Sequence, residues 1–398
     1  MEDLQLLREY AEHRSERAFT ALVTTILLLT AVVFVVRMRP NPNKPGVVTT
    51  TALTLRGTVR TPDGKPLAGA LVRAATPQAY VRLYQTTNLV PATNIASAVS
   101  NQTARVPRQA PSVITGADGS FVIGLPELPQ DGLAAVVVES DAGYGLVTAD
   151  ELSANPVVVV QPWARIEGVL RIGKSLASNE TVNIGIWGST ELYDWNLVQH
   201  GASTKTDANG RFVFPRVAPV DVWLTCTVMV RTNDGRQSGH HYVKVQPGDQ
   251  LQVQLGGVGR ALTGRVPWSP TNKLVFYGRM WANAVPGIRH PRNWKEMSRE
   301  AQRQYERAWR DTPEGEVWKE SVRNYEFPVQ SNGTFRVDDV LPGSYRMQLR
   351  ADEPIPGGKG MRRAAEVEIL VDVPELFAGE SDEPIDIGVL IPRPSAPQ

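Results

Sequence analysis

Cysteine is almost missing from this sequence, because the 398 residues contain a single one, Cys226. One cysteine excludes an intrachain disulfide, so the chain is not a disulfide-dense secreted domain and its modules must rest on hydrophobic cores. Cys226 lies within the apolar stretch 222–228, which predicts a strand with a buried, unreactive thiol.

A charge excess and catalytic signatures are missing too. The net charge is +1, from 42 basic and 41 acidic residues, so no electrostatic footprint for nucleic acid is present. The GxSxG elbow, the P-loop and the dinucleotide fingerprint do not occur, and the Gly-rich stretch 256–259 precedes a predicted strand rather than a helix. The pair His240–His241 follows a turn and is expected to be exposed in a hairpin, without metal-ligand spacing. We therefore predict no enzyme, catalytic residue, metal or cofactor.

Long apolar runs are absent except at residues 18–36, AFTALVTTILLLTAVVFVV. This run has no charge and would extend about 28 Å as a helix, close to the hydrocarbon thickness of a bilayer. A buried core helix would carry a polar stripe. A cleaved signal peptide would have a less acidic start and a small-residue cleavage site, which residues 37–40 do not provide. The run therefore predicts an uncleaved transmembrane helix, with the lipid bilayer as a partner.

The orientation of this helix is not decided by charge, because three positive residues precede it and three follow it: Arg8, Arg14, Arg17, Arg37, Arg39 and Lys44. A short tail before the helix and a large β region after it favour a cytoplasmic amino terminus. We expect a single-pass protein of a bacterial cell envelope, with the carboxy-terminal region in the periplasm or at the cell surface.

Residues 1–17 place Leu4, Leu7 and Ala11 at helical spacing and predict a short amphipathic cytoplasmic helix. The segment 4–23, with LLREYAEHRSERAF at its centre, resembles the first helix of extracytoplasmic-function sigma factors, which opens their polymerase-binding region. None of the promoter-recognising helices follows, so sigma activity is not implied. A docking helix, a fusion remnant and an ordinary juxtamembrane helix remain as alternatives.

Proline and glycine are plentiful, with 30 and 33 residues, and favour many short strands broken by turns. Residues 37–54 begin with several prolines and predict an extended linker. Three internal repeats follow, each with a glycine-containing strand, an Asp-Gly or Asn-Gly turn and a Phe-x-Val strand. The repeats contain LRGTVRTPDGKPLAGALV (55–72) and ADGSFVIGL (117–125), IEGVL (166–170) and DANGRFVF (207–214), and LTGRV (262–266) and SNGTFRV (331–337).

The turns explain the repeat. The glycines at 64, 119, 210 and 333 follow Asp or Asn and supply the positive φ of tight turns. Phe121, Phe212 and Phe335 begin the next strand, where alternate side chains face a shared core. These features predict an all-β chain of three tandem sandwiches.

Two segments carry a family resemblance: GTVRTPDGKPLAGALVRA and TGADGSFVIGLP in the first repeat are similar to the carboxypeptidase regulatory-like domain. The third repeat fits the closing half of that domain with NGTFRVDDVLPGSYRMQLRA, and the second lacks the Pro-Leu-x-Gly-Ala segment. The resemblance implies a transthyretin-like Greek-key sandwich, also classed as a carbohydrate-binding-like fold. In that family the module usually accompanies another functional domain, which has no room in this chain.

Two insertions interrupt the repeats. Residues 77–112 are polar and predict a long surface loop. Residues 291–325 predict a helix capped by Ser298 with Tyr305 and Trp309 on one face, a break at Thr312-Pro313, and a second helix containing Trp318. This insertion is expected to pack on the sandwich, or alternatively to dock a partner.

Four tryptophans near predicted strand ends or loops are candidates for stacking on a ligand: Trp187, Trp195, Trp281 and Trp294. A core or edge-filling role is the alternative for each of them.

The predicted organisation is a tail (1–17), a transmembrane helix (18–36), a linker (37–54), sandwiches at 55–161, 162–257 and 258–391, and a tail (392–398). We expect a non-enzymatic binding or spacer array whose ligand is cell-wall glycan or a protein. The alternatives are a signalling component coupled to transcription through the sigma-like tail, and an accessory subunit of a separately encoded redoxin or peptidase.

Overall fold

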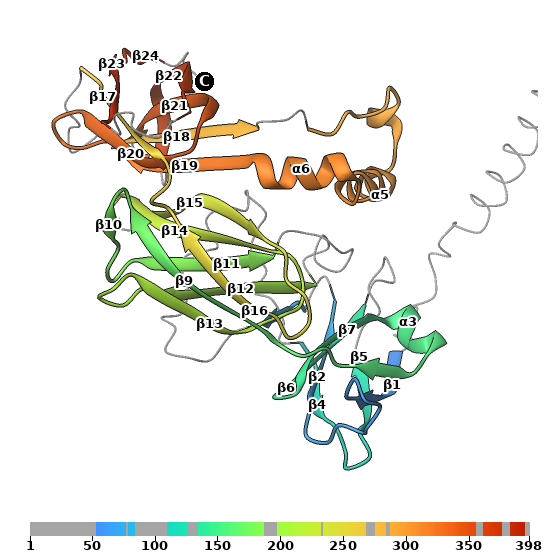
Figure 1. Cartoon of the computed structure of the whole chain (residues 1–398). Helices are drawn as coiled ribbons and strands as arrows, with labels where there is room; N and C mark the ends of the chain where they lie inside the picture. Colours follow the sequence, from blue (N-terminus) through green and yellow to red (C-terminus); the bar gives the residue numbers. More distant parts are fainter. Residues whose placement is uncertain are drawn as a thin grey trace, which may run out of the picture. The chain divides into compact units, whose positions relative to one another are not determined.

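The structure, a computed structural model, describes residues 53–76, 79–83, 110–125, 134–186, 197–231, 234–267, 275–283, 287–355, 361–375 and 383–394 (Figure 1). The predicted tail, transmembrane helix and most of the linker lie outside these residues, as do Trp187 and Trp195. Within the described ranges, no helix has the length and apolar character that crossing a membrane requires. The described chain is mostly β, and its sheets are arranged as sandwiches.

Residues 53–160 form two sheets around one core. Phe121 and Ile123 of one sheet pack against Val72 and Val138 of the other, and all four are buried. The first sheet contains β1 (Leu53–Arg60), β5 (Ser120–Leu125) and β8 (Val157–Val159). The second contains β2 (Leu71–Ala75), β4 (Ser112–Ile114), β6 (Ala135–Ser140) and β7 (Gly143–Thr148), and α3 (Ala149–Ala154) follows β7.

Residues 164–255 form a second pair of sheets. Ile166 and Phe212 of one sheet meet Ile184 and Leu224 of the other. The first sheet contains β9 (Ala164–Ile172), β10 (Ser175–Leu176), β13 (Arg211–Val217) and β16 (Gln250–Leu255). The second contains β11 (Thr181–Ile186), β12 (Val198–Lys205), β14 (Val222–Arg231) and β15 (Asp234–Val243).

The prediction of a surface loop over residues 77–112 is wrong near its start. Residues 81–83 form β3 (Val81–Leu83), which pairs in parallel with β12 and so extends a sheet of the second pair. Val81 and Leu83 are buried there, together with Leu197 and Val198. Val81 and Leu83 lie at spacing two and so share one face of the strand, and their burial stabilises this pairing.

Residues 260–394 form the third pair of sheets. Its core joins Leu262 and Phe335 of one sheet to Met280, Phe327 and Tyr345 of the other. The first sheet contains β17 (Arg260–Arg265), β20 (Thr334–Val340) and β23 (Ile385–Val389). The second contains β18 (Val275–Asn283), β19 (Val322–Pro328), β21 (Gly343–Pro354), β22 (Met361–Val373) and β24 (Arg393–Pro394), which lies in the predicted tail and pairs with β22.

The predicted turn pattern is confirmed. The four turn glycines have positive φ: 81° at Gly64, 76° at Gly119, 69° at Gly210 and 81° at Gly333. The phenylalanines that follow them, at 121, 212 and 335, are buried and lie in the three separate cores described above. The same local sequence thus starts the same core strand three times.

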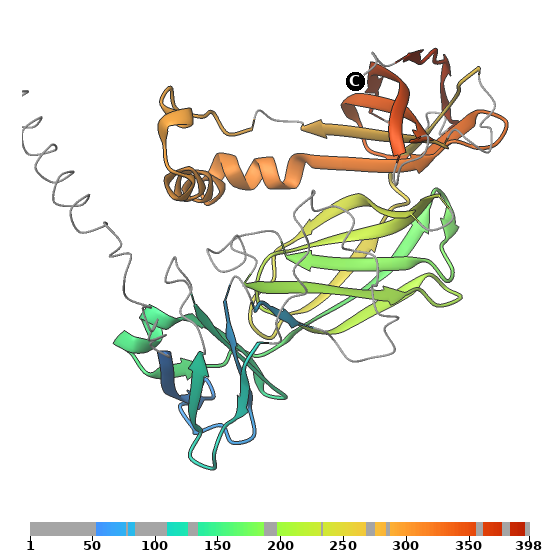
Figure 2. The ribbon, with the colours of Figure 1, turned by 180° about the vertical axis from the view of Figure 1, so that it is seen from behind.

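The two predicted helices in the third repeat are also confirmed, as α5 (Arg299–Arg310) and α6 (Pro313–Ser321). A short 3-10 helix that was not predicted, η2 (Trp294–Glu296), precedes them, and the predicted insertion is four residues too long, because residues 322–325 already belong to β19. The backbone N–H of Ala301 donates to Ser298 Oγ over 3.2 Å, and the N–H of Gly315 donates to Thr312 Oγ1 over 3.1 Å. Both hydroxyls therefore cap helix amino termini. Helix α6 continues directly into β19, so the insertion rises from an edge strand of the third pair (Figure 2).

Candidate binding groove

Strand β15 is an edge strand whose course is changed by a bulge at Gly239. In the pairing with β14, Ser238 lies opposite Cys226 and His241 lies opposite Leu224. Two residues of β15, at 239 and 240, therefore stand opposite the single residue Thr225 of β14. Gly239 has φ +68°, which L-residues with side chains rarely adopt. Because of the bulge, Ser238 points to the side of Cys226, while His240 stacks near Trp223 on the opposite side, with ring centroids 5.6 Å apart.

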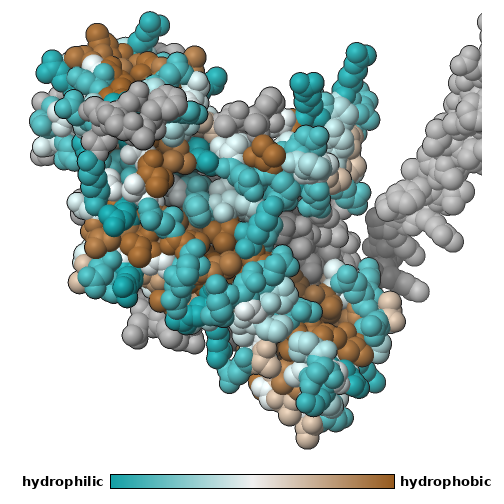
Figure 3. Space-filling view, viewed as in Figure 1, coloured by the Kyte–Doolittle hydropathy of each residue, from teal (hydrophilic) through white to brown (hydrophobic). Residues whose placement is uncertain are grey.

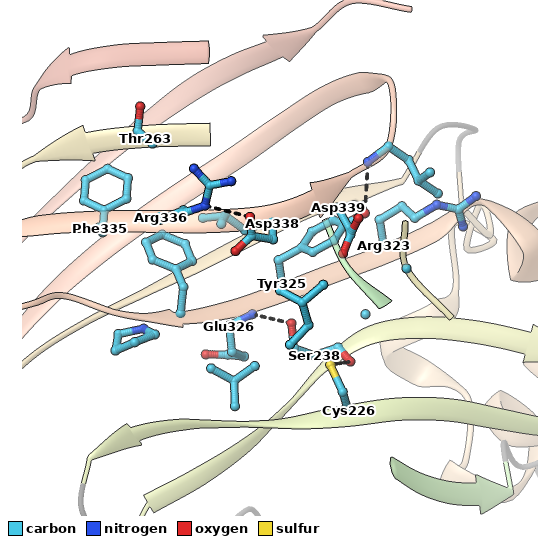
Figure 4. Close-up of a pocket in the computed structure, with 18 of the residues that line it drawn as sticks. Cys226, Ser238, Thr263, Arg323, Tyr325, Glu326, Phe335, Arg336, Asp338 and Asp339 are labelled. Atoms are coloured by element: carbon cyan, nitrogen blue, oxygen red, sulfur yellow. Dashed lines mark hydrogen bonds and ion pairs between the residues drawn. The ribbon is translucent and has the colours of Figure 1, made fainter. Parts of the chain in front are cut away.

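The Ser238 side of β15 contacts the edge strand β19. The Glu326 N–H donates to Ser238 Oγ over 3.1 Å, and the Cys226 thiol donates to the Ser238 carbonyl over 3.4 Å (Figure 4). The Arg236 guanidinium lies 5.7 Å from the centroid of the Tyr277 ring. Two edge strands therefore meet through side chains instead of a hydrogen-bonded ladder.

A second contact between residues 164–257 and residues 260–394 is made by Asp339. Its carboxylate accepts the N–H of Gly173 over 2.9 Å and the N–H of Gly257 over 2.7 Å. A bulge in β20 and a φ of +56° aim this side chain away from its own strand. A Cβ at Gly259 would lie 2.3 Å from the Asp339 carbonyl carbon, so the connecting segment needs glycine to pass there.

The third contact involves helix α6. Lys244, just after β15, forms an ion pair with Glu316 over 2.8 Å, and the buried Lys319 pairs with the same carboxylate. The Lys319 ammonium lies 5.3 Å from the ring centroid of Tyr242, whose hydroxyl donates to Asp221. Partial burial raises the pKa of Glu316, but the two lysines outweigh it and the net shift is downward, so this carboxylate stays ionised.

Between these three contacts lies a groove of about 1250 Å³. Its walls come from β9, β14, β15 and β16 on one side and from β17, β19, β20 and β23 on the other. Tyr325, Phe335 and Val337 contribute buried apolar surface, while Arg323 and Arg336 are among its charged residues (Figure 4).

The groove also carries apolar side chains that face solvent. Ile172 is 44% exposed, Val258 65% and Val389 47%. In the view of Figure 3, apolar residues also gather over strands of the second pair. A groove with exposed apolar residues and charged neighbours is suited to hold a ligand through shape and apolar contact.

Reactive groups in the groove are held in unreactive states. Burial raises the pKa of the Cys226 thiol to about 11, so it is protonated at neutral pH and is a poor nucleophile. Burial lowers the pKa of His240, against the opposing effect of a hydrogen bond with the Asn324 backbone, so the imidazole is neutral. The described residues contain no group of three or more potential ligands that could hold a metal ion.

Two expectations about these residues need correction. Cys226 is half-buried and lines the groove, so it is not a fully enclosed core thiol. The histidine pair lies near the end of β15 and only His241 is exposed, because the bulge turns His240 against Trp223. The expectation of an exposed pair was therefore wrong for His240.

The two tryptophan candidates within the described residues lie outside the groove. Trp281 is half-buried in β18, and the Arg279 guanidinium lies 5.2 Å from its ring centroid. Trp294 stacks on His290, with centroids 3.9 Å apart, and meets Tyr305 at 5.9 Å in an edge-to-face arrangement. Both rings therefore have partners within the chain, and their role as ligand-stacking residues stays a prediction.

Sequence reasoning missed Ser238 and Asp339, which line the groove and make contacts beside it. Each is an ordinary polar residue in a strand, and its partner lies 88 residues away for Ser238 and 166 or 82 residues away for Asp339. The glycine-rich stretch 256–259 was the one available signal, because it marks close approach of the backbone to another segment.

No protein-family model matches the sequence, and no curated protein matches it. Among solved structures, the Bacillus anthracis TIE protein has 10% sequence identity over 86% of this chain and 51% of that chain, with a TM-score of 0.19. The shaft pilin spaA from Lactobacillus rhamnosus GG has 13% identity over 52% of this chain and 99% of that chain, with a TM-score of 0.19.

The minor pilin GBS52 from Streptococcus agalactiae has 12% identity over 50% of this chain and 94% of that chain, with a TM-score of 0.23. This chain therefore spans about half the length of the TIE protein. Similarities with TM-scores this low carry no argument about function.

Proposed function

We propose that the chain is a non-enzymatic protein of a bacterial cell envelope, anchored by the transmembrane helix at residues 18–36. Its three regulatory-like sandwiches, at 55–161, 162–257 and 258–391, form a binding and spacer array on the extracytoplasmic side. The groove between β15 and β20 is the ligand site of this array. An extended segment of a protein partner or of a cell-wall glycan is its ligand.

The contacts around the groove carry this proposal. Asp339 holds the connecting segment and the β9–β10 turn, Ser238 holds β19, and Lys244 holds α6. Three separate contacts restrain the second pair of sheets relative to the third, so the groove has fixed walls. A preformed site loses little conformational entropy when a ligand binds.

The residue types support binding over catalysis. The thiol is protonated, and His240 is neutral and half-buried beside Trp223. The remaining wall offers apolar side chains, arginines and carboxylates, which contribute contact area and charge-assisted hydrogen bonds.

A matched pair of tryptophan variants tests the site. Val389→Trp would fill one end of the groove, and Leu370→Trp places the same indole on an exposed β22 position outside it, where Leu370 is 78% exposed. The full-length chain in neutral detergent is screened against a displayed library of twelve-residue peptides and a cell-wall glycan array. We expect ligands of the wild type whose affinity falls at least about tenfold in the Val389→Trp variant and is unchanged in the Leu370→Trp variant. Hits that both variants bind equally, or no hits, would refute the groove as the site.

A further inference from the structure

Strands β7, β15 and β22 are equivalent, because each pairs with the strand just before it in sequence at one end of its sheet. The first two are covered inside the chain. Tyr144 of β7 exchanges two backbone hydrogen bonds of 2.8 Å with Gln161, in the segment after β8. Strand β15 is covered by β19 through the Ser238 contact. The question is what covers β22.

Most of the outer edge of β22 has no strand partner among the described residues. β22 pairs with β21 along its whole length, from Met361 to Val373, whereas β24 meets it only at Ala365 and Glu366. We call residues 367–373 the β22 edge. The backbone N–H and C=O groups of an unpaired edge are a template for another strand.

The inner face of the β22 edge leaves apolar surface uncovered. At the other side of the third pair, β19 and β20 are joined by a bridge between Val329 and Phe335, so β22 and β23 flank its open side. Four apolar residues of these two strands pack against the third core but are only half-buried: Val367, Ile369, Ile385 and Ile387. An added strand would cover them with its own inward-facing residues.

The outer face of the β22 edge has one apolar residue between two acids. Leu370 is 78% exposed, and Glu368 and Asp372, two residues away on the same face, are exposed as well. Arg346 of β21 lies 3.4 Å from Glu368, and Ser344 Oγ donates to Asp372. The ion pair is open to solvent and contributes little, so a cation on an added strand can compete for Glu368.

We propose that the β22 edge binds an extended segment of a protein partner as an added strand, in the antiparallel sense that β24 already uses. Main-chain hydrogen bonds supply the affinity of such a complex, and alternate side chains supply its specificity. The segment carries an apolar residue opposite Leu370 and a Lys or Arg opposite both Glu368 and Asp372. Because the residues between them face the core, its pattern is basic, apolar, apolar, apolar, basic.

A second copy of this chain is a poorer occupant of the edge. If two β22 edges paired antiparallel over residues 367–373, Leu370 would lie opposite Leu370. Glu368 of each copy would then lie opposite Asp372 of the other, and like charges directly opposite one another destabilise a sheet. The inference does not depend on the groove, because no residue of the β22 edge lines it.

The test uses the full-length chain in neutral detergent and a fluorescein-labelled peptide of sequence GSKVLVKSG. The control peptide GSEVLVESG reverses both charges. A second control carries N-methyl groups on the three central amides of GSKVLVKSG, which removes backbone donors on both edges of the strand. Binding is measured by fluorescence anisotropy, and its place by hydrogen exchange over residues 367–373.

Three variants test the chain. Leu370→Lys places a cation at the centre of the edge, and E368K/D372K reverses the charges beside it. The matched control, Val122→Lys, changes a residue that is 55% exposed on the edge strand β5, where its neighbours on the same face carry no charge. All these positions are exposed, and thermal melts establish that the variants fold.

We expect the wild type to bind GSKVLVKSG, with slower hydrogen exchange over the β22 edge, and to bind both control peptides at least about tenfold more weakly. Leu370→Lys should also bind GSKVLVKSG at least about tenfold more weakly, whereas E368K/D372K should prefer GSEVLVESG. Val122→Lys and Val389→Trp should match the wild type, and the second of these separates the β22 edge from the groove.

The proposal is overturned if GSKVLVKSG does not bind, if Leu370→Lys or the N-methylated peptide binds as well as the unmodified pair, or if E368K/D372K keeps the wild-type preference. Analytical ultracentrifugation of the wild type and Leu370→Lys examines the rival occupant. If the wild type self-associates and Leu370→Lys does not, the edge belongs to a second copy and the proposal is wrong.

Discussion

At the scale of single residues, Asp339 links two distant segments of the chain through one side chain. Its carboxylate accepts the backbone N–H of Gly173, in the turn between β9 and β10, and that of Gly257, in the segment that connects β16 and β17. Burial raises the pKa of Asp339, against the opposing effect of the Gly173 and Gly257 hydrogen bonds, so ionising this group in the folded state has a cost. The two hydrogen bonds offset that cost in part.

We predict that Asp339→Ala destabilises the chain by about 1–3 kcal/mol, because the partly buried N–H of Gly173 and the exposed N–H of Gly257 lose a charged acceptor. Urea unfolding followed by tryptophan fluorescence measures this change. Asp338→Ala is the control, since its ion pair with the exposed Arg336 is partly open to solvent and contributes about 0–1 kcal/mol. Equal decreases in the free energy of unfolding for the two variants would show that the Asp339 hydrogen bonds contribute no more than an ordinary surface ion pair.

The pH dependence of this residue has a definite sign. The pKa of Asp339 in the folded chain lies above its ordinary value of 3.8. Between pH 3.8 and that folded-state pKa, the native state keeps a proton that the unfolded chain has already released. As pH rises through this window, the titration of Asp339 therefore decreases the free energy of unfolding. We expect Asp339→Asn to show a more positive slope of stability against pH just above pH 3.8 than the wild type. Parallel slopes would contradict this reasoning.

The single thiol gives a second prediction at this scale. With a pKa of about 11 in the folded chain and 9.0 as the ordinary value, Cys226 at pH 8 has about a hundredfold less thiolate than the unfolded chain. DTNB should therefore react at least about a hundred times more slowly with native protein than with protein in urea. Because the sequence has no other cysteine, the signal is unambiguous, and comparable rates would show an accessible thiolate.

At the scale of elements, the bulge in β15 decides how the edge strand is used. An unbroken ladder would put Ser238 and His240 on the same side of β15, whereas the bulge places Ser238 on the side of Cys226 and His240 on the side of Trp223. An edge strand that is twisted and covered in this way is also protected from pairing with another chain.

We predict that Gly239→Ala destabilises the chain by about 1–2 kcal/mol, because its φ of +68° is unfavourable for a residue with a side chain. The space is sufficient, since a Cβ would lie 3.9 Å from Cys226 Sγ, so the effect isolates backbone strain. Gly124→Ala in β5, where φ is not positive and a Cβ meets nothing within 4 Å, should be neutral or slightly stabilising. The denaturant midpoints of the two variants are compared. If Gly239→Ala has the same midpoint as the wild type, the bulge does not require glycine at this position.

At the scale of the whole molecule, the proposed location depends on residues 18–36. Deleting them should move the chain from the membrane fraction to the soluble fraction of expressing cells, because no other run in the sequence is long and apolar enough to hold it. Protease added to intact cells with a permeable outer layer should cut the β region of the intact protein. A membrane-bound deletion variant, or a β region protected in such cells, would contradict the proposed topology.

Much of the local structure could be predicted from the sequence, since it depends on neighbouring residues. Asn209-Gly210 determines a turn because glycine alone reaches the required φ easily, and the following Phe212 reaches the core through strand alternation. Ser298 and Thr312 cap their helices through hydroxyl contacts three residues away. The burial of β3 could not be predicted, because its partner β12 lies more than a hundred residues further along the chain.

The sequence by itself determined the β character, the turns, the capped helices and the expectation of one membrane helix, because each follows from residue types at short, regular spacing. Only the tertiary structure decided where the groove lies, because Ser238, Lys244 and Asp339 acquire their partners through folding and not through sequence proximity. A contact over such a separation depends on how whole sheets pack, and no local pattern encodes that packing.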